Sequence, residues 1–98
     1  MDITKKFEGN KLTVGVAGRV DTTTAPQLES ALNDALAGIN ELVLDFEQLD
    51  YISSAGLRVL LSAQKKMSKL GGMTVRNVNE DVMEIFEVTG FSDILTIL

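Results

Sequence analysis

The 98-residue sequence contains no cysteine and no histidine. Without cysteine the chain has neither disulfides nor thiolate metal ligands, and without histidine it lacks the commonest general base and metal ligand. No apolar run approaches the ~20 residues of a membrane-spanning helix. The first ten residues, MDITKKFEGN, lack the apolar stretch of a signal peptide. We therefore expect a cytoplasmic protein with no membrane insertion, no cofactor and no metal site.

The net charge is −5, and apolar residues make up 45% of the chain. The excess of negative charge argues against nucleic acid as a partner, because a phosphate backbone would be repelled. A chain of this length and composition is expected to form one globular domain over residues 1–98 with a single core.

The hydrophobic pattern predicts an α/β domain with the element order β-β-α-β-α-β-α-β. Apolar residues alternate with other residues over 11–18, which predicts the second strand of a hairpin whose turn is Gly9-Asn10. Apolar residues at helical spacing predict the helices. Gly71-Gly72 and Gly90 are expected to end the second and third helices. The expected strands are 3–8, 11–18, 41–46, 73–78 and 93–98, and the expected helices are 24–37, 54–70 and a third between Asn79 and Gly90.

Two helix starts carry recognisable capping residues. Thr24 is predicted to cap the first helix, with Gln27 three residues later completing a capping box. Asn79 is predicted to cap the third helix, where Glu80 and Asp81 complement the positive end of the helix dipole.

Two strand–helix–strand crossovers predict parallel pairing, and the opening hairpin adds an antiparallel pair. The result is a mixed, mostly parallel sheet packed with helices. Functional loops gather at the carboxyl ends of parallel strands. We therefore expect the segments GRVDTTT (18–24) and DYISSAG (50–56) to be neighbours, although they are far apart in sequence.

Two adjacent serines, Ser53 and Ser54, stand at the start of the helix 54–70 and are followed by Ala55 and Gly56. One serine is enough to cap a helix, so the second is free for another role. A helix start with small side chains also suits an anion. The chain has no P-loop, no dinucleotide-binding glycine motif and no nucleophile elbow, and no histidine is available to activate a serine.

The segments VAGRVDTTTAPQLESAL (16–32) and LVLDFEQLDYISSAGLRVLLSAQKKM (42–67) resemble the anti-sigma factor antagonist family, the STAS-domain proteins of bacterial partner-switching systems. GRVD (18–21) and DYISSAGLRVLL (50–61) carry the resemblance. The family form of the second is an aromatic, an apolar residue, often Asp, then Ser, Ser/Thr/Ala, Gly and Leu. The element order agrees over essentially the whole chain, so the resemblance implies a STAS fold.

In that family a serine is phosphorylated by a kinase that is also the anti-sigma factor. Aligning Gly56-Leu57 with the family's Gly-Leu places this serine at Ser54. Ser53 stands where the best-known members have Asp, which makes Ser53 the second candidate. Asp21 matches an acidic residue implicated in kinase recognition.

The resemblance implies a regulatory binding protein, not an enzyme. The unphosphorylated form would bind an anti-sigma factor with serine kinase activity and so free a sigma factor. Phosphorylation would end this binding, and a serine phosphatase would restore it. We expect the protein to be a monomer.

The partner-binding surface is predicted from these segments and from the helix that follows. The apolar arc of helix 54–70 spans about 200°, wider than the ~100° of an ordinary surface helix. Either a neighbouring helix covers Leu57 and Leu61, or they form a docking patch beside Ser54. The predicted contact residues are Asp21, Thr22, Thr23, Ser53, Ala55, Gly56, Leu57, Arg58 and Leu61.

Other interpretations of the same residues stay open at the level of sequence. Asp21 could cap the turn before the first helix, and Asp21, Asp45 and Asp50 could in principle share a metal ion. The whole chain could be a STAS subunit of a lipid-transport or stress-signalling complex without phosphorylation. A small hydrolase using Ser54 is a further alternative, although it would lack a base.

Overall fold

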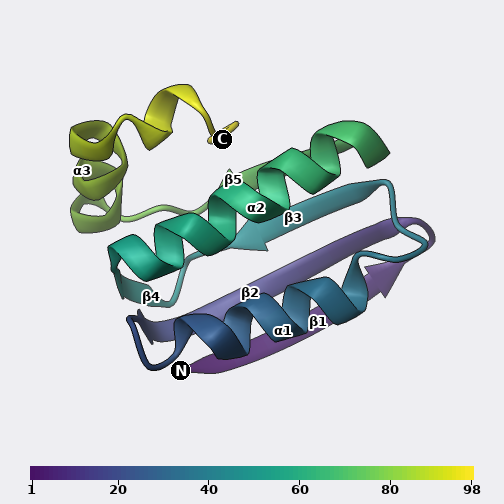
Figure 1. Ribbon diagram of the computed structural model, residues 1–98, viewed down its shortest axis with the longest axis horizontal. Helices are drawn as coiled ribbons and strands as arrows, with labels where there is room; N and C mark the ends of the chain where they lie inside the picture. Colours follow the sequence, from purple (N-terminus) through teal and green to yellow (C-terminus); the bar gives the residue numbers. More distant parts are fainter.

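A computed structural model describes residues 1–98 and contains five strands, three α-helices and one short 3-10 helix (Figure 1). In chain order the elements are β1 (Asp2–Glu8), β2 (Lys11–Val20), α1 (Ala25–Ala35), β3 (Glu41–Asp45), β4 (Leu49–Ile52), α2 (Ser54–Leu70), β5 (Gly72–Arg76), α3 (Glu80–Thr89) and η1 (Phe91–Asp93).

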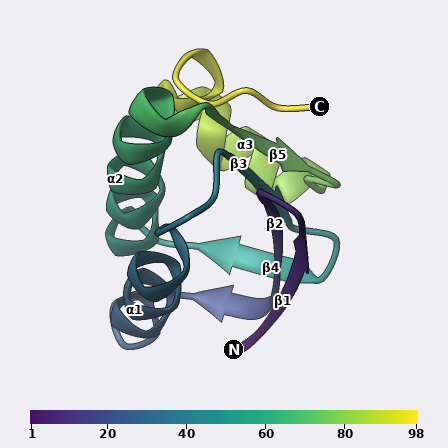
Figure 2. The ribbon, with the colours of Figure 1, turned by 90° about the vertical axis from the view of Figure 1, so that its right-hand side faces the viewer.

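The strands form one mixed sheet in the order β1-β2-β3-β5, with β4 attached to the far end of β2. The β1–β2 hairpin is antiparallel, and the β2–β3, β3–β5 and β2–β4 pairs are parallel. The predicted mixed, mostly parallel α/β fold is therefore confirmed. Helices α1 and α2 lie side by side on one face of the sheet, and α3 lies at the end where β4 and the start of α2 meet (Figures 1 and 2).

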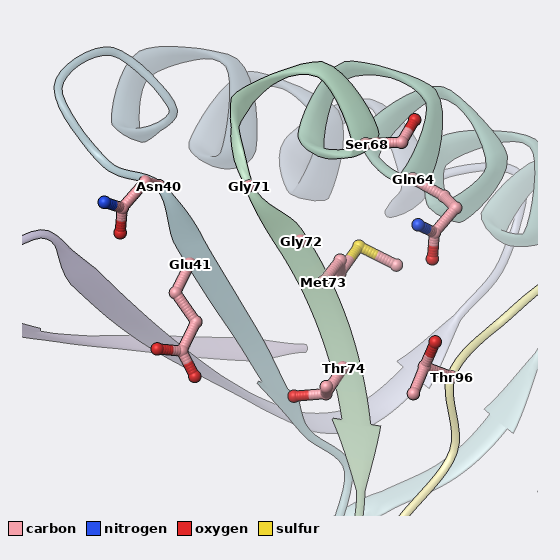
Figure 3. Close-up of a pocket in the computed structure, with 9 residues that line it drawn as sticks. All are labelled: Asn40, Glu41, Gln64, Ser68, Gly71, Gly72, Met73, Thr74 and Thr96. Carbon is pink, nitrogen blue, oxygen red and sulfur yellow. The ribbon is translucent and has the colours of Figure 1, made fainter.

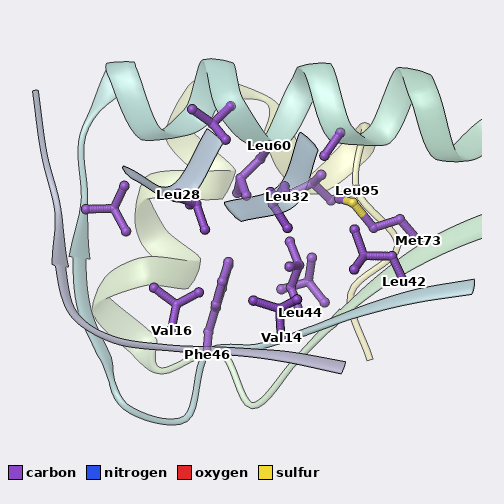
Figure 4. Close-up of a cluster of buried hydrophobic side chains, with 14 of the residues drawn as sticks. Val14, Val16, Leu28, Leu32, Leu42, Leu44, Phe46, Leu60, Met73 and Leu95 are labelled. Carbon is purple, nitrogen blue, oxygen red and sulfur yellow. The ribbon is translucent and has the colours of Figure 1, made fainter. Parts of the chain in front are cut away.

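The core lies between this face of the sheet and the helices α1 and α2 (Figure 4). Alternate residues of β2 point into it, as expected for a strand with one covered face. Strand β3 differs, because three consecutive residues are buried and Val43 on the outer face is only 4% exposed. Strand β3 is paired on both sides, with β2 and β5, and is therefore an inner strand of the sheet. Core residues from four elements are Leu12, Val14, Val16, Leu28, Leu32, Leu42, Leu44 and Leu60.

Strand β4 is not among the strands predicted from the sequence. It forms because β2 is ten residues long and runs past the end of β3. At Gly18, whose φ is +93°, the register of β2 shifts, and its last residues pair with β4. A four-residue strand is too short for its own periodicity to show, so its pairing is decided by the exposed end of β2.

The predicted last strand, 93–98, is wrong. After Gly90, which has φ +81°, the chain forms η1 and then makes a single parallel bridge between Val75 and Ile97. The Val75 N–H donates to the carbonyl of Thr96 (2.9 Å), and the Leu98 N–H donates to the carbonyl of Val75 (2.9 Å). The turn through η1 takes up residues that a full strand would need.

The two predicted caps have different outcomes. Asn79 caps α3, because its Oδ1 accepts the Val82 N–H (2.8 Å), while its Nδ2 donates to the Leu49 carbonyl (2.8 Å) and ties α3 to β4. The capping box at Thr24 is not formed. Thr24 occupies the N-cap position, but its hydroxyl accepts the Asp21 N–H (2.8 Å) instead of a helix N–H.

None of the helices combines the length and the apolar character that crossing a membrane would require.

Candidate functional site

The segments after β2 and around β4 meet at the carboxyl ends of these two strands. Their last residues, Val20 and Ile52, are register partners. One residue further on, the Ser53 N–H donates to the Val20 carbonyl (2.8 Å). The prediction that residues 18–24 and 50–56 are neighbours is therefore confirmed.

The structure gives the two serines different environments. Ser53 has extended backbone angles and is the N-cap of α2, with its Oγ accepting the Gly56 N–H at 3.4 Å. Ser54 is the first residue of the helix, and its side chain is exposed. The Ser54 hydroxyl has no hydrogen-bond partner within the chain. Ser53 therefore has a structural role, whereas the side chain of Ser54 is accessible to another protein.

Gly56 is a packing residue of the first turn of α2. It is buried, and a Cβ atom at this position would lie 2.6 Å from Ile52 Cγ1 and 2.7 Å from Val20 Cγ1. Real Cβ atoms do not approach other atoms so closely, so only glycine lets the helix start sit directly on β2 and β4. Contrary to the prediction, Gly56 offers no surface to a partner, because atoms of its own chain fill the space around it.

The broad apolar arc of α2 is largely explained by packing. Leu57 is 5% exposed and belongs to the core, so the prediction that it forms part of a docking patch is wrong. Leu61 is half-buried, and Arg58 is exposed. Of the two flank leucines, only Leu61 keeps surface that a partner could contact.

Asp21 organises the loop between β2 and α1. Its Oδ1 accepts the N–H groups of Thr23 (3.0 Å) and Thr24 (3.1 Å) and the hydroxyl of Thr23 (2.7 Å). The Thr24 hydroxyl lies 3.2 Å from the same oxygen and 3.0 Å from the Arg19 carbonyl, and can donate its proton to either. The Thr23 hydroxyl and then the Thr24 N–H lower the pKa of Asp21 below its ordinary value.

The structural role of Asp21 is thus the capping of this turn, one of the two alternatives left open by the sequence. Only Oδ1 is used, since Oδ2 accepts no hydrogen bond from this chain. The ionised carboxylate therefore still presents a negative charge beside the start of α2.

The exposed hydroxyls of Thr22 and Thr23 differ in their surroundings. Thr23 is held by Asp21, whereas Thr22 lines a shallow groove of about 230 Å³ between the amino-terminal turns of α1 and α2. Ala55 and Arg58 line the opposite side of this groove. The remaining lining residues are Ala25, Pro26, Glu29 and Val59.

The sequence did not point to Arg19 and Tyr51. The guanidinium carbon of Arg19 lies 4.5 Å from the centre of the Tyr51 ring, within the range of a cation–π contact. Both side chains are exposed at the end of the β2–β4 pair. Their juxtaposition follows from the register of β4, a strand that the sequence pattern does not predict.

The three carboxylates considered for a metal ion do not gather. The chain contains no group of three or more acidic side chains that could hold one. Asp45 instead accepts the Asn77 amide (3.0 Å) and the Glu47 N–H (3.1 Å), and the Asn77 bond is the main reason that the pKa of Asp45 is lowered.

The geometry of this site and the fold that holds it can be compared with known proteins. A model of the STAS domain matches residues 2–98. The chain belongs to the STAS domain family. The resemblance of its two motif segments to that family is thereby confirmed.

Relatives and solved structures add detail to the family assignment. BtrV of Bordetella bronchiseptica, named as an anti-sigma factor antagonist, is 39% identical over 82 residues, covering 82% of this chain and 71% of that protein. The anti-sigma-B factor antagonist of Bacillus subtilis is 29% identical over 98 residues, covering 99% and 90%. The crystal structure of an anti-sigma factor antagonist from Mycobacterium paratuberculosis has a TM-score of 0.89 at 25% identity, covering 98% and 83%.

The close contacts at Gly56 predict a strong effect of a single methyl group. Gly56→Ala should lower the free energy of unfolding by about 1–3 kcal/mol, the usual cost of overpacking a filled core. Chemical denaturation of the parent and the variant measures this difference. Gly72→Ala is the matched control, since a Cβ there has no atom within 4 Å and the backbone φ is not positive. Equal losses in both variants would contradict the packing role of Gly56.

Proposed function

We propose that this STAS domain is an anti-sigma factor antagonist that is switched by phosphorylation of Ser54. The observation that carries the proposal is the exposed Ser54 hydroxyl, which has no hydrogen-bond partner, at the first position of α2 beside the Asp21 loop. The family membership and the names of the relatives support the antagonist part of this proposal. In this scheme the unphosphorylated form binds an anti-sigma factor with serine kinase activity, which releases its sigma factor.

The physics of the site favours a switch that leaves the fold unchanged. A phosphate on Ser54 would add roughly −1.5 to −2 charges at neutral pH. At the amino terminus of α2 this charge meets the positive end of the helix dipole and free backbone N–H groups, so the domain tolerates it. A partner surface that had covered the bare hydroxyl would instead bury an unpaired dianion, which costs several kcal/mol.

The proposed contact surface surrounds Ser54 and uses the side chains that remain accessible. Asp21 contributes its free carboxylate oxygen, and Arg58 and Thr22 line the α1–α2 groove. Phosphorylation would place a second negative charge near Asp21, and a phosphatase would remove it. The accessible members are Asp21, Thr22, Thr23, Ser53, Ala55, Arg58 and Leu61.

The phosphorylation site can be located with two alanine variants. With a candidate anti-sigma kinase and ATP, Ser54→Ala should abolish incorporation of phosphate. Ser53→Ala should keep a substantial rate, although loss of the cap destabilises α2 by about 1 kcal/mol. Mass spectrometry of the digested protein identifies the modified serine. Phosphate found on Ser53 alone would show that Ser53, not Ser54, is the switch.

A permanent charge at the same position tests the mechanism of release. Ser54→Asp should bind the anti-sigma partner at least tenfold more weakly, which corresponds to ~1.4 kcal/mol. It should unfold at the same temperature as the parent or above it, because a carboxylate at a helix amino terminus is favourable by ~0.3–1 kcal/mol. Calorimetry gives the affinity, and thermal unfolding gives the stability. Ser54→Asn is a neutral control of the same size, and equal binding by both variants would refute an electrostatic switch.

The charge of Asp21 can be separated from its role in the turn. Asp21→Asn keeps an oxygen that accepts the Thr23 and Thr24 N–H groups, so the melting temperature should change little. Loss of the charge should weaken kinase binding by up to about fivefold, the size of a partly exposed charge pair. Asp21→Ala should lower both the melting temperature and the affinity, because the turn loses its acceptor. Parent-like affinity of Asp21→Asn would leave Asp21 with the capping role alone.

A further inference from the structure

Arg58 is the one cationic side chain in the first two turns of α2, and it follows Ser54 by four residues. Residues four apart on a helix lie on the same side of it, with Cβ atoms about 5–6 Å apart. At 3.6 residues per turn, Arg58 is rotated about the helix axis by roughly 40° from Ser54 and roughly 60° from Ala55. Both Ser54 and Arg58 are exposed, so packing does not keep their side chains apart.

No acidic group of the chain pairs with Arg58. The one ion pair in the molecule joins Lys6 and Glu8 of β1 (3.5 Å). Glu29 of α1 lines the same groove of about 230 Å³ as Arg58, yet the two do not form an ion pair. The guanidinium of Arg58 is therefore free to bind an anion that comes within its reach.

Ser68, the other exposed serine of α2, has different surroundings. Its hydroxyl donates to the Lys65 carbonyl (3.0 Å) within the helix. It lines a polar cleft of about 560 Å³ near the carboxyl-terminal end of α2, and no cationic side chain lines that cleft (Figure 3). The combination of a free hydroxyl and an unpaired arginine is thus found at the amino-terminal end of the helix and not at this one.

The other charged groups near Ser54 favour a role for Arg58. Asp21 presents its free carboxylate oxygen beside the start of α2, and Glu29 lies across the groove. Arg19, the other cation at this end of the molecule, lies over the Tyr51 ring. A phosphate on Ser54 would add roughly −1.5 to −2 charges beside two carboxylates. Arg58 is the cation that is left to compensate this charge.

We propose that Arg58 binds the phosphate of phosphorylated Ser54 and is thereby withdrawn from the surface offered to the anti-sigma partner, an inference that rests on the proposed function. The guanidinium donates two parallel N–H bonds to two phosphate oxygens, the geometry that suits arginine. An anion placed four residues before a cation is also the favourable order on a helix. Phosphorylation then changes the contact surface twice, because it adds a dianion and takes up the neighbouring cation.

The competing explanation is that the backbone N–H groups at the start of α2 hold the phosphate without help from a side chain. These groups remain when Arg58 is replaced. A substitution of Arg58 therefore separates the two sources of binding, provided that the property measured belongs to the phosphate itself.

The phosphate is installed as phosphoserine at position 54 during translation, and phosphorus NMR then follows its second ionisation. A nearby cation favours the dianion, so Arg58→Gln should raise this pKa by about 0.3 or more, and Arg58→Lys, which keeps the charge, should raise it less. Lys65→Gln removes the same charge from an exposed position about 16 Å further along the helix and is the matched control. The same pKa in the parent and Arg58→Gln would overturn the proposal, as would an equal rise in Lys65→Gln.

The withdrawal of Arg58 from the surface is measured with phenylglyoxal, which modifies accessible guanidinium groups. With phosphoserine at position 54, Arg58 should react more slowly than in the unmodified protein, by about twofold or more. Arg76, exposed on β5, is the internal control and should react at the same rate in both forms. Equal reaction of Arg58 in both forms would show that the phosphate leaves this side chain on the surface.

Neither measurement depends on a kinase, because the phosphate is present from synthesis. A failure of the anti-sigma kinase to modify Ser54 would refute the proposed function without changing the pKa or the reactivity of Arg58. Conversely, a phosphate that ignores Arg58 would refute this inference while phosphorylation of Ser54 by the kinase still stood.

Discussion

The placement of the first turn of α2 on the end of the β2–β4 pair is the contact on which the candidate site depends. The Ser53 N–H bonds to the Val20 carbonyl, and Gly56 lies so close to Val20 and Ile52 that no side chain fits between them. These two contacts hold the helix start beside the Asp21 loop. A side chain at position 56 would push the helix start away from the end of this strand pair.

The same arrangement explains why two serines stand in a row. Ser53 caps α2 by accepting the Gly56 N–H. The Ser54 hydroxyl is therefore not needed for a hydrogen bond within the fold. A hydroxyl that the fold does not use can be modified without a loss of packing. In the proposed function, stability and regulation are therefore divided between neighbouring residues, and a charge added to Ser54 acts on the partner and not on the core.

Helix α2 also connects two ends of the molecule with different chemistry. Its amino-terminal end offers a free hydroxyl and the charged side chains of Asp21 and Arg58. Its carboxyl-terminal half carries Gln64, whose buried Oε1 has no hydrogen-bond partner. Ser54 and Gln64 lie about 15 Å apart along the helix.

The sequence alone determined the order of most elements, the parallel crossovers and the nearness of the two loops, because apolar periodicity and connection rules act over short stretches. It also pointed to Ser54, through a family resemblance carried by local motifs. Only the tertiary structure decided what depends on distant neighbours. Pairing with the end of β2 makes residues 49–52 a strand and places Arg19 beside Tyr51. Packing into the core buries Leu57. In each of these cases the deciding partner is remote in sequence, and local patterns carry no information about it.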